Sequence, residues 1–450
     1  NNAANVVSTL DWRLQSFTAE ILRQHLLSVH RQNVKDGAVL VVENKTGDVL
    51  AYIGSSGDLS SARYVNGIHA KRQAGSTLKP FLYAAAFEKK LLTAASMIDD
   101  SPLDISVVTG IYRPRNYDSQ FQGLVNARTA LASSLNVPAV KILQLVGVEP
   151  FLQKLKHIGF DGLDESDDFY GPSIALGSAD VSLWELVNAY RTLANEGIWS
   201  EMRLTFDMET KPSYRREFSK EASFIISDIL SDREARSNTF GLESPLSTRF
   251  WTAVKTGTSK DMRDNWCIGY SSKYTVGVWV GNFSGEPMWN VSGITGAAPV
   301  WVEIIDWLHR SDPDQPKKPA TGMLSKKNLS ERAEWFIKGT EPDTISRTGI
   351  SPHVSQHIAY PVTGTIIALD PDIPYEQQKV FFESQPIDNN NSHRWVLDGE
   401  DMSYSWTHVG WTPVAGKHTL LLIGQENKVV GSVNFEVRGN TEQLTEKLPY

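Results

Sequence analysis

The sequence predicts two folded units, a layered α/β (α+β) domain in which helices cover an antiparallel sheet, and after it a small all-β sandwich. Three observations support this fold class. Short β-rich runs stand on both sides of a helical stretch that extends from about residue 76 to 230. A segment rich in Pro, Gly and charge follows near residue 313. Beyond it come short strands at regular spacing, without a helical pattern.

The first unit is predicted to open with a helix and a hairpin. Residues 14–30 place apolar side chains at helical spacing. In residues 37–54, β-branched side chains flank the turn-forming residues 44–48, which indicates two strands joined by a turn. Helical patterns then dominate until residue 230.

Strands return after residue 250 in three runs, "FWTAVKTGTS", "NWCIGYSS" and "YTVGVWVGNF". They are aromatic, β-branched and separated by turn residues, so we predict an antiparallel meander that joins the first hairpin in one sheet. The only cysteine, Cys267, lies in the second run. An internal disulfide is therefore impossible, and we expect a buried thiol. An amphipathic helix near residue 310 closes the unit.

Composition sets the domain boundaries. We predict a first domain over residues 1–312, a linker over 313–352 and a C-terminal, immunoglobulin-like sandwich over 353–450. The tryptophans of the last domain are expected in its core, with a sugar-stacking platform as the alternative. They are Trp395, Trp406 and Trp411.

Charge and hydropathy exclude several classes of function. The net charge of -8 gives no broad basic field, so nucleic acid is not expected as a partner. No apolar run is long enough to span a bilayer, and no signal peptide is recognisable. Because the chain begins without Met, we expect a piece of a longer polypeptide, and a membrane segment could precede it. The later histidines lack the paired spacing of a metal site, so no metal or cofactor is predicted. They are His309, His353, His357, His393, His408 and His418.

The stretch "RQAGSTLKPF" places Ser76 and Lys79 three residues apart, a spacing at which helical side chains share a face. Pro80 would clash with the carbonyl of Ser76 inside a helix, so Ser76 is predicted at a helix N-terminus. A neutral lysine can take a serine's proton, provided that burial or another cation lowers its pKa from about 10.4 toward 7 or 8. The pair thus predicts a serine nucleophile with a lysine base.

Two further motifs add to this pair. "ASSLNVPA" supplies Ser134 and Asn136 where a helical run ends. "VKTGTS" supplies a cation, hydroxyls and a glycine on a predicted strand, where backbone can meet a ligand edge to edge. These residues are Lys255, Thr256, Gly257 and Thr258. An S-x-x-K pattern alone is also explained by an ordinary N-cap with an exposed lysine, so the three motifs together carry the prediction.

The order and spacing of the three motifs resemble the penicillin-binding transpeptidases and the serine β-lactamases. Stretches such as "YRPRNYDSQFQG" and "PSIALGSADVSLWELVNAYRTLANEG" are similar to the transpeptidase domain of class A penicillin-binding proteins. The terminal β module resembles an extra domain found in that class, and the glycosyltransferase domain is absent from this chain. The resemblance implies a peptidoglycan D,D-transpeptidase of the bacterial periplasm, anchored in the inner membrane through an upstream segment.

That resemblance implies a role for each motif residue. Ser76 would attack the D-Ala-D-Ala carbonyl of a stem peptide, and Lys79 would take its proton. Ser134 would relay a proton to the leaving amine, and Asn136 would bond the substrate amide and Lys79. Lys255 would be the second cation that lowers the pKa of Lys79.

The third motif would bind the donor. Thr256 and Thr258, on either side of Gly257, would hold the substrate carboxylate, and the N–H groups of Ser76 and Thr258 would form an oxyanion hole. β-Lactam antibiotics would react as the stem peptide does. A cell-wall or periplasmic protein could bind the C-terminal domain.

Some residues differ from those common in the family, and the sequence leaves alternative functions open. Ala74 and Leu78 differ from common family choices, and we expect Leu78 only to repack. Glu165, in the acidic loop "DGLDESDD", could be a deacylating base, but a solvated charged loop is favoured. The alternatives to a transpeptidase are therefore a β-lactamase and a catalytically weak or idle protein that binds peptidoglycan or partners.

Overall fold

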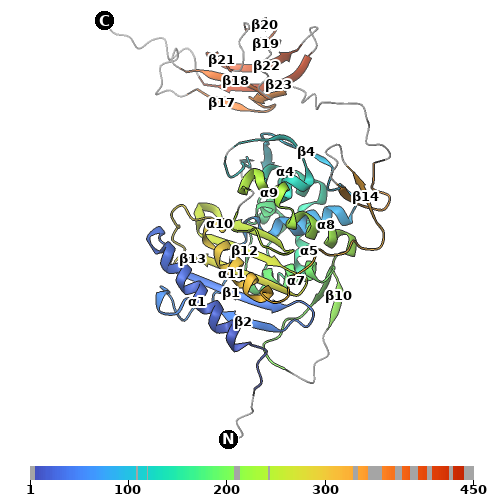
Figure 1. Ribbon diagram of the computed structural model, residues 1–450. Coiled ribbons are helices and arrows are strands. Elements are labelled where there is room, and N and C mark those ends of the chain that lie inside the picture. Colours follow the sequence, from blue (N-terminus) through green and yellow to red (C-terminus); the bar gives the residue numbers. More distant parts are fainter. Residues whose placement is uncertain are drawn as a thin grey trace, which may run out of the picture.

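The computed structural model describes most of the chain (Figure 1). Within this part, no helix is both long and apolar enough to cross a bilayer. The described residues are 6–107, 110–118, 120–206, 213–241, 244–327, 333–342, 357–369, 378–385, 394–402, 408–424 and 429–439.

A five-stranded antiparallel sheet forms the centre of the first domain, in the order β11-β12-β13-β1-β2. Its first hairpin joins the later meander through the β1–β13 pair, as predicted. Cys267 is buried on β12, also as predicted. The strands are β1 (Asp36–Glu43), β2 (Val49–Ile53), β11 (Ala253–Thr258), β12 (Asp264–Tyr270) and β13 (Tyr274–Gly281).

Both faces of this sheet are covered. Along β1, Leu40 and Val42 belong to one apolar cluster and Val39 and Val41 to another, because successive strand residues point to opposite faces. Helices α1 (Trp12–Val29) and α11 (Ala298–His309) cover the second face (Figure 1). The remaining helices supply most of the first cluster. The domain is thus a three-layer α/β structure, which confirms the predicted fold class.

The central helical region supplies the layer that holds the predicted nucleophile. Its helices are α2 (Lys79–Glu88), α3 (Ala127–Ala132), α4 (Asn136–Val146), α5 (Val148–His157), α6 (Asp167–Tyr170), α7 (Leu183–Ala194), α8 (Lys220–Ser231) and α9 (Arg233–Phe240), with α10 (Gly293–Gly296) after the meander. Short 3-10 turns lie at His30–Gln32, Gly57–Leu59, Gly75–Leu78, Gly171–Leu176 and Lys260–Met262.

Four two-stranded ladders interrupt this region and were not predicted. Each strand has only two to four residues, too few for an alternating pattern to stand out in the sequence. The pairs are β3 (Arg72–Gln73) with β8 (Asp180–Val181), β4 (Met97–Asp100) with β7 (Gly123–Asn126), β5 (Ile105–Val107) with β6 (Gly110–Tyr112), and β9 (Ile198–Ser200) with β10 (Tyr214–Arg216).

The predicted linker, 313–352, requires a correction. Inside it, β14 (Met323–Lys327) and β15 (Ala333–Ile337) form an antiparallel hairpin. Trp335 packs edge-on against Phe224 of α8, at 5.5 Å between ring centroids. The hairpin therefore belongs to the first domain. Its membership of the first domain could not be predicted from its composition, because the hairpin contacts residues that are far away in the sequence.

The C-terminal domain is a β-sandwich, as predicted. Its two sheets have the orders β16-β18-β21 and β17-β23-β22-β19-β20, and their apolar side chains share one buried cluster. Trp395 is in that core and Trp411 packs against it, whereas Trp406 lies outside the described residues. The strands are β16 (His357–Tyr360), β17 (Ile366–Ala368), β18 (Val380–Gln385), β19 (Arg394–Leu397), β20 (Glu400–Asp401), β21 (His408–Trp411), β22 (Gly416–Ile423) and β23 (Val429–Arg438).

Candidate active site

Ser76 lies in the 3-10 turn Gly75–Leu78, directly before α2. Pro80 is in the first turn of α2, where its missing N–H and its ring are tolerated, so the predicted placement of Ser76 is confirmed. Leu78 is fully buried in the core and is not part of the cleft wall, as expected of a repacked residue. The turn therefore fixes Ser76 on a rigid base.

Glycine is required where this turn is packed most tightly. The backbone N–H of Gly75 donates to the carbonyl of Gly177 at 3.0 Å. Gly177 adopts a left-handed conformation with φ +76°, and a Cβ added there would lie 1.9 Å from the carbonyl oxygen of Gly75. The segment that ends at Gly177 thus holds the nucleophile turn by direct backbone contact.

Ser134 lies in the break between α3 and α4, with a left-handed φ of +62° that is uncommon for a residue with a side chain. Its N–H donates to the carbonyl of Leu131 at 3.1 Å, and that of Leu135 donates to Ala130 at 2.9 Å. The last turn of α3 therefore holds the strained residue in place, and strain of this kind is concentrated at functional sites.

Lys79 is fully buried and points into this break. Its Nζ lies 2.6 Å from the carbonyl oxygen of Ser134, 2.6 Å from Asn136 Oδ1 and 3.1 Å from the carbonyl oxygen of Leu135. It also lies 3.5 Å from Ser134 Oγ. The structure thus brings Lys79, Ser134 and Asn136 together, as the sequence motifs predicted.

Lys255 reaches the same hydroxyl from β11. Its Nζ donates to Ser134 Oγ at 2.7 Å and to the carbonyl of Thr256 at 2.9 Å. The two lysine amines, which come from segments 176 positions apart in the sequence, therefore both contact one serine oxygen. A proton can pass between these groups without a change in the fold.

Burial is the main cause of the lowered pKa values of Lys79 and Lys255. It lowers the pKa of Lys79 well below the ordinary 10.5, and the positive charge of Lys255 lowers it further, whereas Asp100 opposes the shift. Burial likewise lowers the pKa of Lys255 to about 7, and the Arg236 guanidinium adds to that effect. The second cation predicted from sequence is present, but desolvation contributes more than its charge.

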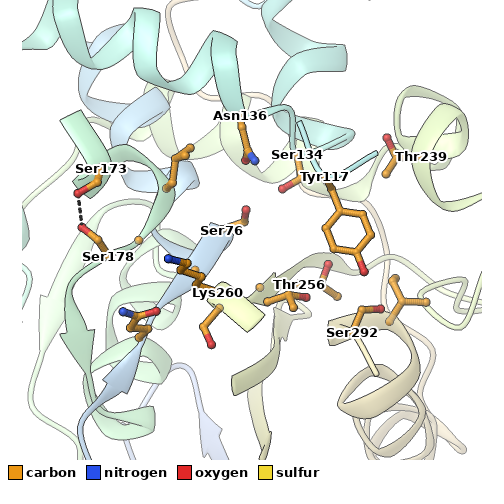
Figure 2. Close-up of a pocket in the computed structure, with 18 of the residues that line it drawn as sticks. Ser76, Tyr117, Ser134, Asn136, Ser173, Ser178, Thr239, Thr256, Lys260 and Ser292 are labelled. Atoms are coloured by element: carbon orange, nitrogen blue, oxygen red, sulfur yellow. Dashed lines mark hydrogen bonds between the residues drawn. The ribbon is translucent and has the colours of Figure 1, made fainter. Parts of the chain in front are cut away.

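A cleft of about 480 Å³ opens above these groups. Figure 2 shows Ser76 between Asn136 and Ser134 on one side and Thr256 on the other. Among the described residues, Ser76 Oγ has no hydrogen-bond partner and Lys260 is the only charged side chain in the cleft wall. The wall has no carboxylate within the described ranges. The hydroxyl of Ser76 is therefore free to contact a ligand.

The strand that carries the third motif, β11, is one of the two edge strands of the central sheet. Thr256, Gly257 and Thr258 line the cleft, and Thr258 Oγ1 accepts a hydrogen bond from the N–H of Gly293 at 3.0 Å. Because that oxygen accepts from Gly293, its own proton can be donated to an anionic ligand. The edge also offers backbone groups for an extended peptide.

Position 257 requires a glycine for a different reason from the one predicted. A Cβ added at this residue would lie 2.7 Å from Thr77 Cγ2 and 2.8 Å from the carbonyl oxygen of Ala74. From the sequence, we expected the glycine to allow the close approach of a ligand. In the structure the absent side chain lets β11 pack against the nucleophile turn, so Gly257 sets the distance between two motifs.

Sequence reasoning missed a series of hydrogen bonds that links Asn136 to Asn116 and Asp100. Asn116 Oδ1 accepts from the backbone N–H of Asn136 at 2.8 Å, and its Nδ2 donates to both carboxylate oxygens of Asp100 at 2.9 and 2.8 Å. Asn136 Nδ2 donates to the carbonyl of Arg115 at 2.7 Å. Asn116 stands within "YRPRNYD", a stretch that supported the family resemblance without assigning this residue a role.

Glu165 is exposed and does not line the cleft. It could not act on an ester at Ser76 from that position. The solvated loop that we favoured is thus the arrangement in the structure, and the reading of Glu165 as a deacylating base is wrong.

Comparison with known families agrees with this geometry. Residues 37–302 match the model of the penicillin binding protein transpeptidase domain, and residues 352–435 match the Penicillin-Binding Protein C-terminus Family. The chain is 31% identical over 327 residues to penicillin-binding protein 1C of Escherichia coli, covering 68% of this chain and 41% of that protein. It is 29% identical to penicillin-binding protein 1A of Clostridium botulinum, covering 76% and 46% respectively. The chain thus spans less than half the length of these relatives.

Solved structures show the same fold. Penicillin-binding protein 1A of Haemophilus influenzae superposes with a TM-score of 0.62 at 22% identity, over 69% of this chain and 54% of that chain. PonA1 of Mycobacterium tuberculosis, in complex with penicillin V, superposes with a TM-score of 0.59 at 21% identity, over 76% and 92%. At these identities the likeness supports the architecture alone.

Proposed function

The chain belongs to the penicillin-binding protein transpeptidase family, and from this premise we propose that it is a peptidoglycan D,D-transpeptidase that forms an acyl-enzyme on Ser76. The observation that carries the proposal is the contact of two buried lysine amines, Lys79 and Lys255, with Ser134 Oγ beside the unpartnered Ser76 hydroxyl. This arrangement supplies a base and a proton relay at one nucleophile.

In the first half-reaction, Ser76 Oγ attacks the carbonyl carbon between the two D-Ala residues of a donor stem peptide. The neutral amine of Lys79 takes the serine proton, which passes through Ser134 to the nitrogen of the departing D-Ala. The C–N bond breaks, D-Ala leaves as a free amine, and an ester to Ser76 remains. The backbone N–H groups of Ser76 and Thr258 stabilise the transient oxyanion.

In the second half-reaction, the amine of a neighbouring stem attacks the ester. Its proton returns by the same relay to Ser76 Oγ, so a new amide forms and the enzyme is restored. A β-lactam follows the first half-reaction, but the nitrogen that leaves stays tethered to the acyl group. The ester on Ser76 therefore persists.

Lys79 is held ready for this reaction but not in contact with Ser76. Its Nζ contacts four acceptors, and the unpartnered Ser76 hydroxyl can rotate. We expect a bound donor to bring the Ser76 hydroxyl to Lys79, since catalytic hydrogen bonds tighten in the substrate complex. Thr256 and Thr258 would meanwhile hold the donor carboxylate, with Lys255 close behind them.

For the whole protein we propose a periplasmic location and an inner-membrane anchor outside this chain. Residues 1–312, together with the hairpin at 323–337, would form the catalytic domain. Residues 353–450 would form a separate module that binds a cell-wall or periplasmic partner. Its family match and its own core support a module of this kind.

A labelled penicillin tests the proposal. The wild-type chain is expected to carry the label on Ser76 for minutes or longer, and Ser76→Ala is expected to carry none. Rapid hydrolysis of the label would favour a β-lactamase. A wild-type chain that never labels but still binds peptidoglycan would favour a catalytically idle binding protein.

The lowered lysine pKa values predict the pH dependence of this labelling. Acylation needs neutral Lys79, so its rate falls as the pH drops through the pKa of that amine, well below 10.5. Lys255→Gln removes a positive charge that lowers this pKa, so the acid limb should move to higher pH. Acylation rates measured from pH 5 to 10 check both statements. A limb near 10.5 in the wild type, or a shift to lower pH in the variant, would contradict them.

A further inference from the structure

A buried ion cluster lies behind the second motif, and one of its members comes from the hairpin at 323–337. Arg128, on α3, and Glu334, on β15, have side chains only 3% and 4% exposed. Arg128 Nε lies 2.9 and 3.2 Å from the two carboxylate oxygens of Glu334, and its Nη2 contacts the same group. The pair is therefore bidentate and shielded from water, the geometry in which such a contact best fixes orientation.

Two carboxylates of the catalytic domain complete the cluster. Asp228 Oδ2 accepts from Arg128 Nη2 at 2.6 Å, and Asp232 Oδ2 accepts from Nη1 at 3.1 Å. Because three acidic groups surround one guanidinium, Glu334 is not needed merely to neutralise Arg128. Burial raises the pKa of Asp228, and the nearby charge of Glu334 raises it further. Arg128 opposes this rise, and Glu334 adds a bidentate contact to the one guanidinium that all three carboxylates share.

The cluster is connected to the cleft by short paths. Arg128 belongs to α3, whose last carbonyls hold the backbone of Ser134 and Leu135. Asp232 caps α9 by accepting from the N–H of Ala235 at 2.9 Å, and the Ala235 carbonyl accepts from Ser133 Oγ at 3.0 Å. The far end of α9 supplies Thr239 and Phe240 to the cleft wall. A change in the position of Arg128 would thus move α3 and α9, and with them Ser134 and the cleft residues of α9.

We propose that Glu334 is a positioning residue for the transpeptidase site, which fixes α3 and α9 through Arg128 and so holds Ser134 in its strained conformation. The proposal rests on the proposed function for its catalytic consequence. Glu334 lies between the two segments that match family models, residues 37–302 and 352–435. The catalytic domain is complete only when the hairpin is in place.

The test compares Glu334→Gln with Glu341→Gln in the full chain. Gln keeps the size of Glu but replaces one acceptor with a donor that faces Arg128. Glu341 is a solvent-facing carboxylate on the same segment that accepts from the N–H of Gly339, so its variant is a matched control. The first readout is hydrogen exchange of the Ser134 and Leu135 amides, which needs no activity. We expect at least a tenfold faster exchange at these two amides in Glu334→Gln, with any further change confined to α3 and α9, and no change in the control.

The second readout is acylation by labelled penicillin, resolved into noncovalent binding and the chemical step. We expect Glu334→Gln to slow the chemical step at least tenfold with little change in the dissociation constant. Unchanged exchange at Ser134 and Leu135, or exchange raised equally in the central sheet, would overturn the proposal. A wild-type chain that fails to label would overturn the proposed function instead, and the exchange data would still decide the role of Glu334.

If Glu334→Gln does not fold, Glu334→Asp replaces it. Asp keeps the charge but is one methylene shorter, so it cannot contact Arg128 as closely at both Nε and Nη2. Faster exchange at Ser134 and slower acylation in this variant would support a positional role. Wild-type values for both would overturn it.

Discussion

Replacing Lys79 with methionine is expected to slow the acylation of Ser76 by labelled penicillin by about 10²- to 10⁴-fold, the range that a general base contributes. Methionine fills a similar volume but cannot take the serine proton. It also leaves the Ser134 and Leu135 carbonyls and Asn136 Oδ1 without the amine that they contact. The rate constant for labelling, followed at several penicillin concentrations, measures the effect.

A matched control is Lys35→Met, which removes a surface lysine that pairs with Glu286 at 2.9 Å. Exposed pairs of this kind contribute little, about 0–1 kcal/mol, so this variant should label at the wild-type rate. The acid limb of the pH profile should also disappear in Lys79→Met, because the group that titrates is gone. Labelling of Lys79→Met at the wild-type rate would assign the base to another residue.

The central sheet and the three motifs could be predicted from sequence because their signals are local. A β-branched run around a turn, or a serine followed by lysine and proline, restricts its own backbone whatever surrounds it. Ser76 before α2 and Lys255 on β11 were placed correctly for that reason. The association of the motifs was inferred from their resemblance to a family, and the structure shows their contact.

The features that sequence reasoning missed are nonlocal. Glu334 reads as a solvent-exposed charge inside a Pro- and Gly-rich segment, since only the distant Arg128 makes its burial favourable. Gly257 could be assigned to a ligand because no local signal shows that Ala74 and Thr77 occupy the space beside it. The sequence predicted burial or a second cation as the cause of a lowered Lys79 pKa but could not rank the two, because desolvation depends on the whole domain.

Replacing Gly177 with alanine should damage the site without removing any reacting group. A left-handed φ of +76° costs a residue with a side chain roughly 1–2 kcal/mol. The added Cβ would also lie 1.9 Å from the Gly75 carbonyl oxygen, so one of the two backbones must move. Since a displacement of about 1 Å can cost about 100-fold in rate, we expect acylation of Ser76 to fall by at least that factor.

Gly285→Ala separates the steric clash from the backbone penalty. Gly285 has the same φ of +76°, but no atom lies within 4 Å of a Cβ added there. This variant should therefore lose stability by the left-handed cost alone and label at the wild-type rate. Thermal unfolding and labelling of both variants give the comparison. If Gly177→Ala labelled as fast as Gly285→Ala, the backbone contact between Gly177 and Gly75 would not be what holds the nucleophile in position.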